Sequence, residues 1–309
     1  MTRVNMLKVV ALSALLATAL ITGCSENECS QPDGCVPDPA LGNIWPNEDQ
    51  ATWTYDYVHR WWDSPGFTIY DDIDSVPPAP SLDDIAALLD AHPIGDSPQS
   101  EEGIYRLKFD GDTTTGPGVT AQNLTRMLVT EDCFDLLASE PAPRGAFLER
   151  FSPALTDTFD VLPDYPMFLR GGAWEKTGEA IVAYGAIDTL PNWKFLEANL
   201  AVGHEFTFEI ISGGPLLHCR ILRRLDFESG IGVLEKAIEC LYMVDSGVLT
   251  FASEYGPIGW TRFFDYGIVV YAPTVGPVYS YERLLVQPGD TPSAGAAEIT
   301  VSLIGASTP

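Results

Sequence analysis

Hydrophobic residues first gather in an uninterrupted run close to the start of the chain. Arg3 and Lys8 precede this run, and residues 9–21 carry no charge. A positive start followed by a short apolar run is typical of a secretory signal, and the run is too short to cross a bilayer comfortably. We therefore expect an N-terminal signal helix that directs export.

The next clear pattern is a strict alternation between aromatic and polar positions. Within residues 52–62, Trp53, Tyr55 and Tyr57 project to one side and the residues between them project to the other. Period two with aromatic enrichment predicts a strand of a half-buried sheet. Such an aromatic stripe is more often one face of a core than a surface for stacking a ligand. These three residues are the candidates for facing a ligand if the second role applies.

Helical spacing occurs in three places. Ser81, followed three residues later by Asp84, precedes apolar residues at helical spacing, which predicts a capped amphipathic helix over residues 82–91. Shorter patterns predict helices over residues 120–128 and 145–151. The sequence thus predicts one to three short helices.

From residue 174 onward the chain is a series of β-rich runs separated by turn-forming residues. The runs span residues 180–184, 205–211, 216–227, 232–244, 248–255, 262–272 and 278–286, and an earlier short strand at 104–109 precedes a turn at 110–112. Connections this short leave no room for crossover helices, so neighbouring strands should be antiparallel. We therefore predict a mainly β fold, with an antiparallel meander sheet arranged as a half-barrel or sandwich.

One hairpin can be placed in register from the sequence. If Ser229 and Gly230 form a two-residue loop, Cys219 faces Cys240 within an apolar column, and oppositely charged residues face each other on the other side. We expect these two cysteines to be cross-strand neighbours. They are either joined by a disulfide or packed as two reduced thiols.

The signal ends in a short motif that contains a cysteine. Residues 21–24 read Ile-Thr-Gly-Cys, which resembles the lipobox of bacterial lipoprotein precursors. The resemblance implies that residues 1–23 are a lipoprotein signal peptide and that Cys24 is diacylated and becomes the new N-terminus. Because Ser25, and not Asp, follows the cysteine, it implies outer-membrane sorting in a host with two membranes. Two acyl chains would anchor the protein stably to a membrane.

A polar, proline-containing segment follows the cysteine. We expect residues 24–43 to be a flexible lipidated tether and residues 44–309 to be a single β-rich domain. Cys29 and Cys35 bracket a turn-prone stretch, and an oxidising compartment would favour a disulfide that closes it into a small loop.

Composition and charge restrict the partners. Hydrophobic residues make up 46% of the 309 residues, which is sufficient for a core, whereas 43 acidic and 17 basic residues give a net charge of -26. A polyanion repels phosphate backbones, so we expect no nucleic-acid partner. The simplest interpretation of this charge is that it keeps the protein soluble outside the cytoplasm.

Several local motifs together resemble a known set of proteins. They are Gly-Gly-Ala-Trp at 171–174, Asp-Ser-Gly at 245–247 and Tyr-Ala-Pro-Thr-Val-Gly-Pro-Val at 271–278, with Trp53 and Tyr55 in the early aromatic strand. This combination is similar to uncharacterised bacterial lipoproteins, in which Gly is usual at the position of Thr274. The resemblance implies an exported β-rich domain, and the last motif implies a tight turn between two strands. It brings no activity or ligand with it.

No catalytic or cofactor motif accompanies these patterns. The sequence has no Gly-x-Ser-x-Gly elbow, no His-Glu-x-x-His and no phosphate-binding glycine loop. We therefore expect no enzymatic activity, no cofactor and no metal.

Three classes of function remain. The leading hypothesis is a binding module for an apolar small molecule or lipid; the alternatives are a structural or protein-interaction component of the cell surface, and a hydrolase with scattered catalytic residues. An unfilled cavity lined by Trp53, Tyr55 and Tyr57 would favour the carrier, whereas a solid core there would favour the interaction role.

Overall fold

The computed structural model describes residues 39–45, 49–61, 70–91, 99–116, 119–130, 133–137, 173–184, 193–210, 215–253, 256–286 and 297–307. The chain divides into two units, Met1–Pro37 and Asp38–Pro309, and every described residue belongs to the second. The lipobox cysteine Cys24, the pair Cys29 and Cys35, and the helix predicted over 145–151 lie outside the described residues.

Strands make up most of the described unit. The helical segments are α2 (Leu41–Ile44), the short 3-10 helix η1 (Ile73–Ser75) and α3 (Leu82–Ala91). The first strands are β1 (Thr52–Trp61), β2 (Gln99–Gly116), β3 (Val119–Thr130), β4 (Cys133–Leu137), β5 (Ala173–Lys176), β6 (Ala180–Tyr184) and β7 (Trp193–Glu197). The later strands are β8 (Glu205–Glu209), β9 (Leu216–Ser229), β10 (Gly232–Asp245), β11 (Leu249–Ser253), β12 (Gly256–Thr261), β13 (Phe263–Ala272), β14 (Gly276–Val286) and β15 (Ala297–Ser307). The predicted mainly β fold is confirmed.

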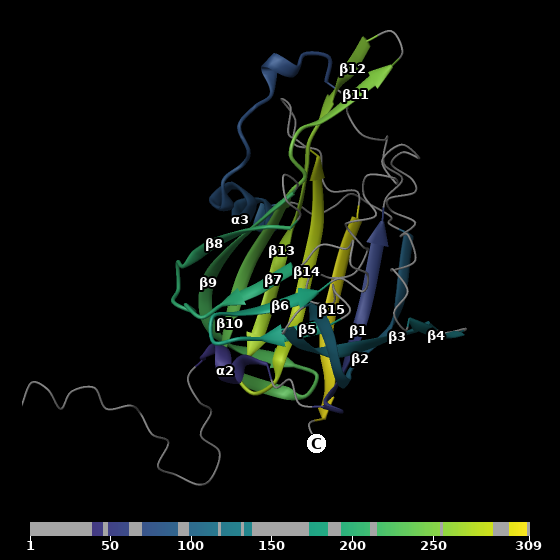
Figure 1. Cartoon of the computed structure of the whole chain (residues 1–309), viewed down its shortest axis with the longest axis vertical. Helices are drawn as coiled ribbons and strands as arrows, with labels where there is room; N and C mark the ends of the chain where they lie inside the picture. The colour runs from purple at the N-terminus through teal and green to yellow at the C-terminus, as the bar shows by residue number, and fades with distance from the viewer. Residues whose placement is uncertain are drawn as a thin grey trace, which may run out of the picture. The chain divides into compact units, whose positions relative to one another are not determined.

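Nearly all strands join one open antiparallel sheet. Its order is β7-β6-β5-β3-β2-β1-β15-β14-β13-β10-β9-β8, with β4 paired to β3 beside this path, and β11 and β12 form a separate hairpin. The meander holds for runs such as β8-β9-β10 and β13-β14-β15, but β1 lies between β2 and β15. The two ends of the unit's chain therefore meet side by side in the middle of the sheet (Figure 1).

The two faces of the sheet carry two hydrophobic clusters. The larger cluster contains the aromatic side of β1 together with buried residues from β2, β10, β13 and β15. The smaller one lies where α3 covers the opposite face, with Leu82 and Ile85 against Leu241, Met243 and Phe264. Because successive side chains of a strand point to opposite faces, one strand can contribute residues to both clusters.

The predicted helix α3 is confirmed together with its cap. Ser81 Oγ accepts the backbone N–H of Asp84 (3.2 Å), and Asp84 Oδ2 accepts the backbone N–H of Ser81 (2.8 Å). This reciprocal pair is a capping box, which satisfies two backbone donors at the start of the helix. Arg220 on β9 pairs with both Asp83 and Glu205, and so ties α3 to the sheet.

Two local predictions in the first half of the chain are wrong. Residues 120–128, predicted as a helix, lie within β3, which pairs with β2 from Val119 to Val129. Pairing along this length outweighs weak helical spacing, since β propensity depends on the neighbouring strands. The turn predicted at 110–112 lies inside β2 as a register shift, and Gly111 there has a φ of 77°. Only glycine adopts such a backbone readily, so the strand bends and continues.

The register predicted for the β9–β10 hairpin is also wrong. The turn consists of Gly230 and Ile231, so Cys219 faces Tyr242, and Cys240 faces Ile221. A Cβ on Gly230 would lie 2.9 Å from the backbone oxygen of Leu303, so the close approach of β15 places the turn at this glycine. The shifted register pairs Arg223 with Glu239 at 2.6 Å, whereas a two-residue loop of Ser229 and Gly230 would have placed Arg223 opposite Lys236.

The folded unit begins earlier than the predicted boundary at residue 44. Leu41 and Ile44 of α2 are buried, and so is Trp45 directly after the helix. Lys176 donates hydrogen bonds to the carbonyl oxygens of Gly42 (3.1 Å) and Trp45 (2.9 Å). Residues 39–43 therefore belong to the body and not to the tether, because Leu41 among them lies in the core.

The turn between β13 and β14 confirms the tight turn implied by the 271–278 motif. Thr274 has a φ of 64°, which is a left-handed conformation that a β-branched residue rarely adopts. Its side chain is exposed, while its backbone N–H donates to the carbonyl of Asn43 in α2. The backbone thus explains why glycine would be expected at this position.

Replacing Thr274 by glycine is expected to raise the free energy of unfolding by about 1 kcal/mol, since it relieves the strained φ and removes no packing. Thr274→Ala is the matched control, because alanine keeps a Cβ and therefore keeps most of the strain. Denaturant unfolding of both variants measures the difference. A glycine variant no more stable than the alanine variant would show that the turn is unstrained.

Candidate functional site

The three predicted ligand-facing residues are all buried. Trp53 Nε1 donates to the carbonyl of Val275 (2.6 Å), and the hydroxyl of Tyr55 donates to the carbonyl of Pro277 (2.9 Å). Tyr57 packs edge-on against Tyr105, with ring centroids 4.7 Å apart. Burial raises the pKa of Tyr55 well above its ordinary value, so this hydroxyl stays neutral.

Further aromatic residues surround this group. Trp45 and Phe109 both pack against Trp53, at 6.0 Å and 5.4 Å between ring centroids, and Trp45 also contacts Trp174 at 4.2 Å. Trp174 in turn stacks on Phe195 at 4.1 Å. The aromatic stripe of β1 is thus one side of a packed core, which was the more common of the two roles considered.

The cysteines at the centre of the sheet are free thiols in the structure. Cys219 and Cys240 are both buried and unbonded in the structure, which corresponds to the second of the two arrangements considered, two reduced thiols. Burial, together with a contact to Cys240, raises the pKa of the Cys219 thiol well above its ordinary value. Because the thiolate is the reactive form of cysteine, this position is not a nucleophile in its buried state.

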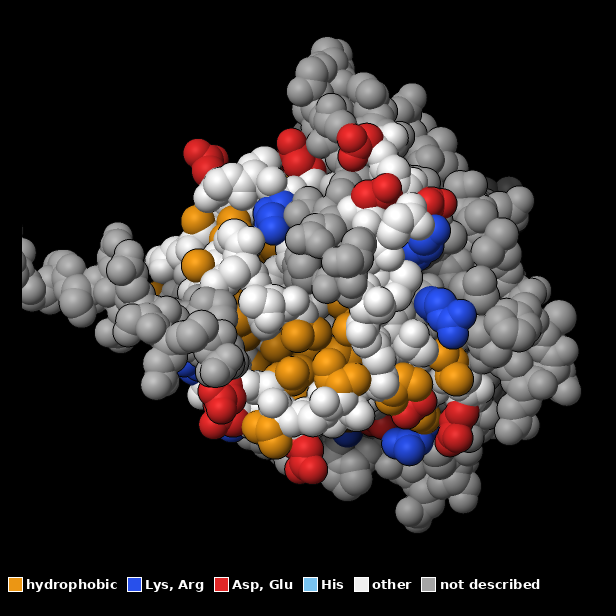
Figure 2. Space-filling view, turned by 90° about the horizontal axis from the view of Figure 1, so that it is seen from below, with side chains coloured by type: hydrophobic (Ala, Val, Ile, Leu, Met, Phe, Trp, Pro, Cys, Tyr) orange, Lys and Arg blue, Asp and Glu red, His pale blue; other side chains and the backbone are white. Residues whose placement is uncertain are grey.

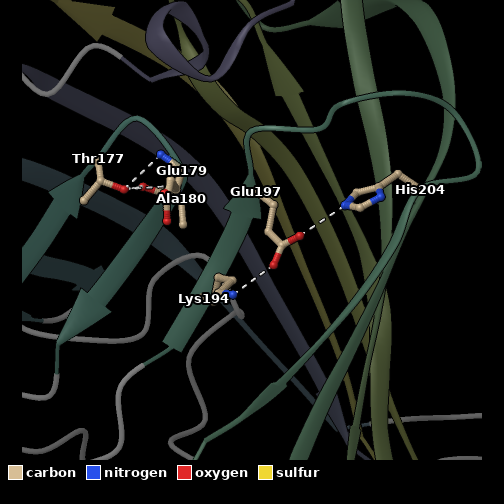
Figure 3. Close-up of polar contacts among 6 residues, drawn as sticks. All are labelled: Thr177, Glu179, Ala180, Lys194, Glu197 and His204. Carbon is tan, nitrogen blue, oxygen red and sulfur yellow. Dashed lines mark hydrogen bonds and ion pairs between the residues drawn. The ribbon is translucent and has the colours of Figure 1, made fainter.

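A polar cluster lies at the connection between β7 and β8, the two edge strands of the sheet, which are consecutive along the chain. Glu197, the last residue of β7, accepts from Lys194 Nζ (2.9 Å) and from His204 Nε2 (3.1 Å) (Figure 3). Lys194 also lies over the rings of Phe206 and Phe208 on the neighbouring part of β8, at 5.9 Å and 5.3 Å. The cluster therefore links β7 to β8 across the connection between them.

The hydrogen bonds specify the tautomer of His204. Asn199 Oδ1 accepts the backbone N–H of Ala201 (3.1 Å), which leaves its amide nitrogen to donate to His204 Nδ1 (3.0 Å). Nδ1 is then an acceptor, so Nε2 carries the proton that is donated to Glu197. Both ring nitrogens are engaged: the lone pair on Nδ1, which a general base would use, accepts the hydrogen bond from Asn199.

Glu197 gives this cluster an expected pH dependence. Burial acts to raise its pKa, but the hydrogen bonds from Lys194 and His204 outweigh burial and lower it. A carboxylate with a lowered folded-state pKa stabilises the protein above its unfolded pKa of about 4.3, and that contribution is lost as the pH falls through the folded value.

Glu197→Gln should therefore flatten the loss of stability between about pH 6 and pH 3, as measured by urea unfolding at several pH values. The control is Glu179→Gln, because backbone atoms of Glu179 make its contacts with Thr177 and Ala198. Identical pH profiles for wild type and Glu197→Gln would show that the cluster contributes nothing.

A second polar site lies at the C-terminal end of β10. Asp245 forms a two-pronged ion pair with Arg262, and both side chains are largely buried, at 9% and 13% exposure. The same carboxylate accepts the backbone N–H of Gly247 (2.9 Å). This contact confirms the turn predicted at 245–247. The pair fixes the base of the β11–β12 hairpin, which lies at the opposite end of the sheet from α2 (Figure 1).

A metal site is not evident within the described ranges, where no group of three or more His, Cys, Asp or Glu side chains converges. In the same part of the chain no helix is both long enough and apolar enough to cross a membrane. No pattern along the chain pointed to the Glu197–His204 contact, because an irregular connection brings these residues together.

Comparison with known proteins gives distant structural likenesses only. No protein-family model and no curated protein matches the sequence. Two solved structures are similar over 89% of this chain and 100% of their own, each at 8% identity. One is a protein assigned as exported, with a YmcC-like fold, from Bacteroides fragilis (TM-score 0.31), and the other is assigned as a lipoprotein from Parabacteroides distasonis (TM-score 0.30). At TM-scores this low the likeness has no bearing on function.

Proposed function

We propose that this chain is an exported lipoprotein, anchored by lipid on Cys24, whose β-rich body acts as a non-catalytic interaction module at the membrane surface. The observation that carries the proposal is the short separation along the sequence between the lipobox and the folded unit. The folded unit begins at Asp38, so only a short polar segment separates it from Cys24. Because Ser25 follows the cysteine, the outer membrane is the proposed destination in a host with two membranes.

The packed interior favours an interaction module over a carrier of apolar ligands. Trp53, Tyr55 and Tyr57 are buried against other aromatic residues. The polar groups of Trp53 and Tyr55 donate hydrogen bonds to backbone carbonyls. A carrier needs an apolar cavity, and these side chains fill the space that they were expected to line. Catalysis finds no support at His204 or Cys219, since both ring nitrogens of the histidine are engaged and the thiol is held neutral.

Metabolic labelling with a palmitate analogue tests the anchor. Wild type should be labelled, and Cys24→Ala should lose the label entirely, since no other thiol lies in a lipobox. Cys29→Ala is the matched control, because it removes a cysteine from the same segment and should remain labelled. Persistent label on Cys24→Ala, or unlabelled wild type, would refute lipidation at this site.

Native mass spectrometry of the detergent-extracted protein separates the interaction module from the carrier. The packed aromatic core predicts a protein that retains no apolar molecule once its own acyl chains are counted. A stoichiometric bound lipid or other apolar ligand would favour the carrier instead.

A further inference from the structure

Two aliphatic side chains are exposed at the turn between β9 and β10. Ile231 lies in the turn and is 42% exposed, and Val233 follows it at 66% exposure. Phe227 and Leu234, which face each other across the hairpin, pack partly buried against the large cluster. We call residues 227–234 the hairpin tip; it presents two apolar side chains to solvent on a hydrophobic base.

The backbone of the hairpin tip is fixed in place. The N–H of Gly230 donates to the carbonyl of Leu303 on β15 (3.0 Å), at an approach too close for any other residue. Ser229 Oγ accepts the N–H of Ile231 (3.3 Å) and donates to the carbonyl of Gly232 (2.9 Å). The exposure of Ile231 is therefore set by contacts that hold the turn against the sheet.

The hairpin tip lies at the end of the sheet where the folded unit begins. Leu303 pairs with Tyr55 near the start of β1, and at this end the β13–β14 turn donates a hydrogen bond from Thr274 to Asn43 of α2. The segment between Cys24 and Asp38 joins the body next to α2. Seen from this end, hydrophobic side chains gather near the middle of the face (Figure 2).

Charge around the hairpin tip is nearly balanced. Residues 223–236 carry three acidic and three basic side chains, whereas the whole chain has a net charge of -26. Within the hairpin tip itself, residues 227–234 carry one charged side chain, Glu228, which faces Val233, so the tip is close to neutral in an otherwise strongly acidic protein. A neutral surface with exposed aliphatic residues can approach lipid headgroups that would repel a polyanion.

We propose that the hairpin tip inserts Ile231 and Val233 into the interfacial region of the bilayer that holds the lipid anchor. This inference rests on the proposed function, because two aliphatic side chains bind a bilayer too weakly alone and need the acyl chains to concentrate them at its surface. Docking through this end orients the body, so that the β11–β12 hairpin points away from the membrane.

Photo-crosslinking of the full mature lipoprotein in phosphatidylcholine vesicles tests the docking. A photoreactive amino acid replaces either Ile231 or Val248, which is 41% exposed at the opposite end of β10 and so matches Ile231 in accessibility. We expect several-fold more crosslinked lipid from position 231 than from position 248. Circular dichroism should show both variants folded, because each replaces an exposed side chain.

The intact mass of each preparation separates the two ways in which the inference can fail. An unacylated N-terminus would overturn both the anchor and the docking. An acylated protein with equal lipid crosslinking at the two positions, or with position 231 crosslinked to a second copy of the chain, would overturn the docking and leave the anchor standing.

Discussion

Replacing Trp45 by alanine is expected to lower the free energy of unfolding by about 3–5 kcal/mol, the usual cost of removing a large buried aromatic side chain. Trp45 contacts Trp53, Phe109 and Trp174, and its ring lies 3.0 Å from where a Cβ on Gly276 would be. It therefore connects the segment after α2 with β1, β2, β5 and the β13–β14 turn.

Trp45→Phe is the informative comparison. Trp45 Nε1 is buried and finds no hydrogen-bond partner within the structure as described, so phenylalanine removes an unsatisfied donor along with some volume. It should cost much less than alanine. Urea unfolding of residues 25–309 measures both variants, and an alanine variant as stable as wild type would return residues 39–43 to the tether.

Asp245→Ala is expected to be nearly as damaging, at about 3–5 kcal/mol, because it leaves the guanidinium of Arg262 buried without its partner. The carboxylate also holds the 245–247 turn through the N–H of Gly247. Loss of Asp245 should therefore loosen the base of the β11–β12 hairpin.

A double-mutant cycle with Arg262→Ala isolates the pair. The double variant should be more stable than the sum of the two single losses predicts, since neither charge is then left unpaired. Asp110→Ala serves as the control; it removes an exposed pair with Lys108 and should cost far less. Strictly additive losses for Asp245 and Arg262 would mean that the contact contributes no coupling.

Local patterns predicted the elements whose signals are local. The alternation of 52–62 gave β1 and its buried side, and the Ser81–Asp84 spacing gave α3 with its cap. β15 was missed although it lies between β1 and β14, because its partners come from opposite ends of the sequence. The helix predicted over 120–128 is a strand for the same kind of reason, because its structure is determined by pairing with β2.

At the polar sites too, local signals were predicted and contacts between distant residues were not. The turn at 245–247 was visible as an Asp-Ser-Gly signal, but its ion pair with Arg262 depends on where β13 begins. The Cys219–Cys240 neighbourhood was anticipated, yet the register was displaced because Gly230 must sit against β15, a strand not foreseen. Contacts across the fold, and not residue types, determined each of these differences.

The mass of the N-terminal peptide from membrane-extracted protein tests the lipoprotein assignment most directly. We expect a chain that begins at Cys24 and carries acyl groups on that residue. A chain that still begins at Met1, or one cut elsewhere with an unmodified Cys24, would contradict it.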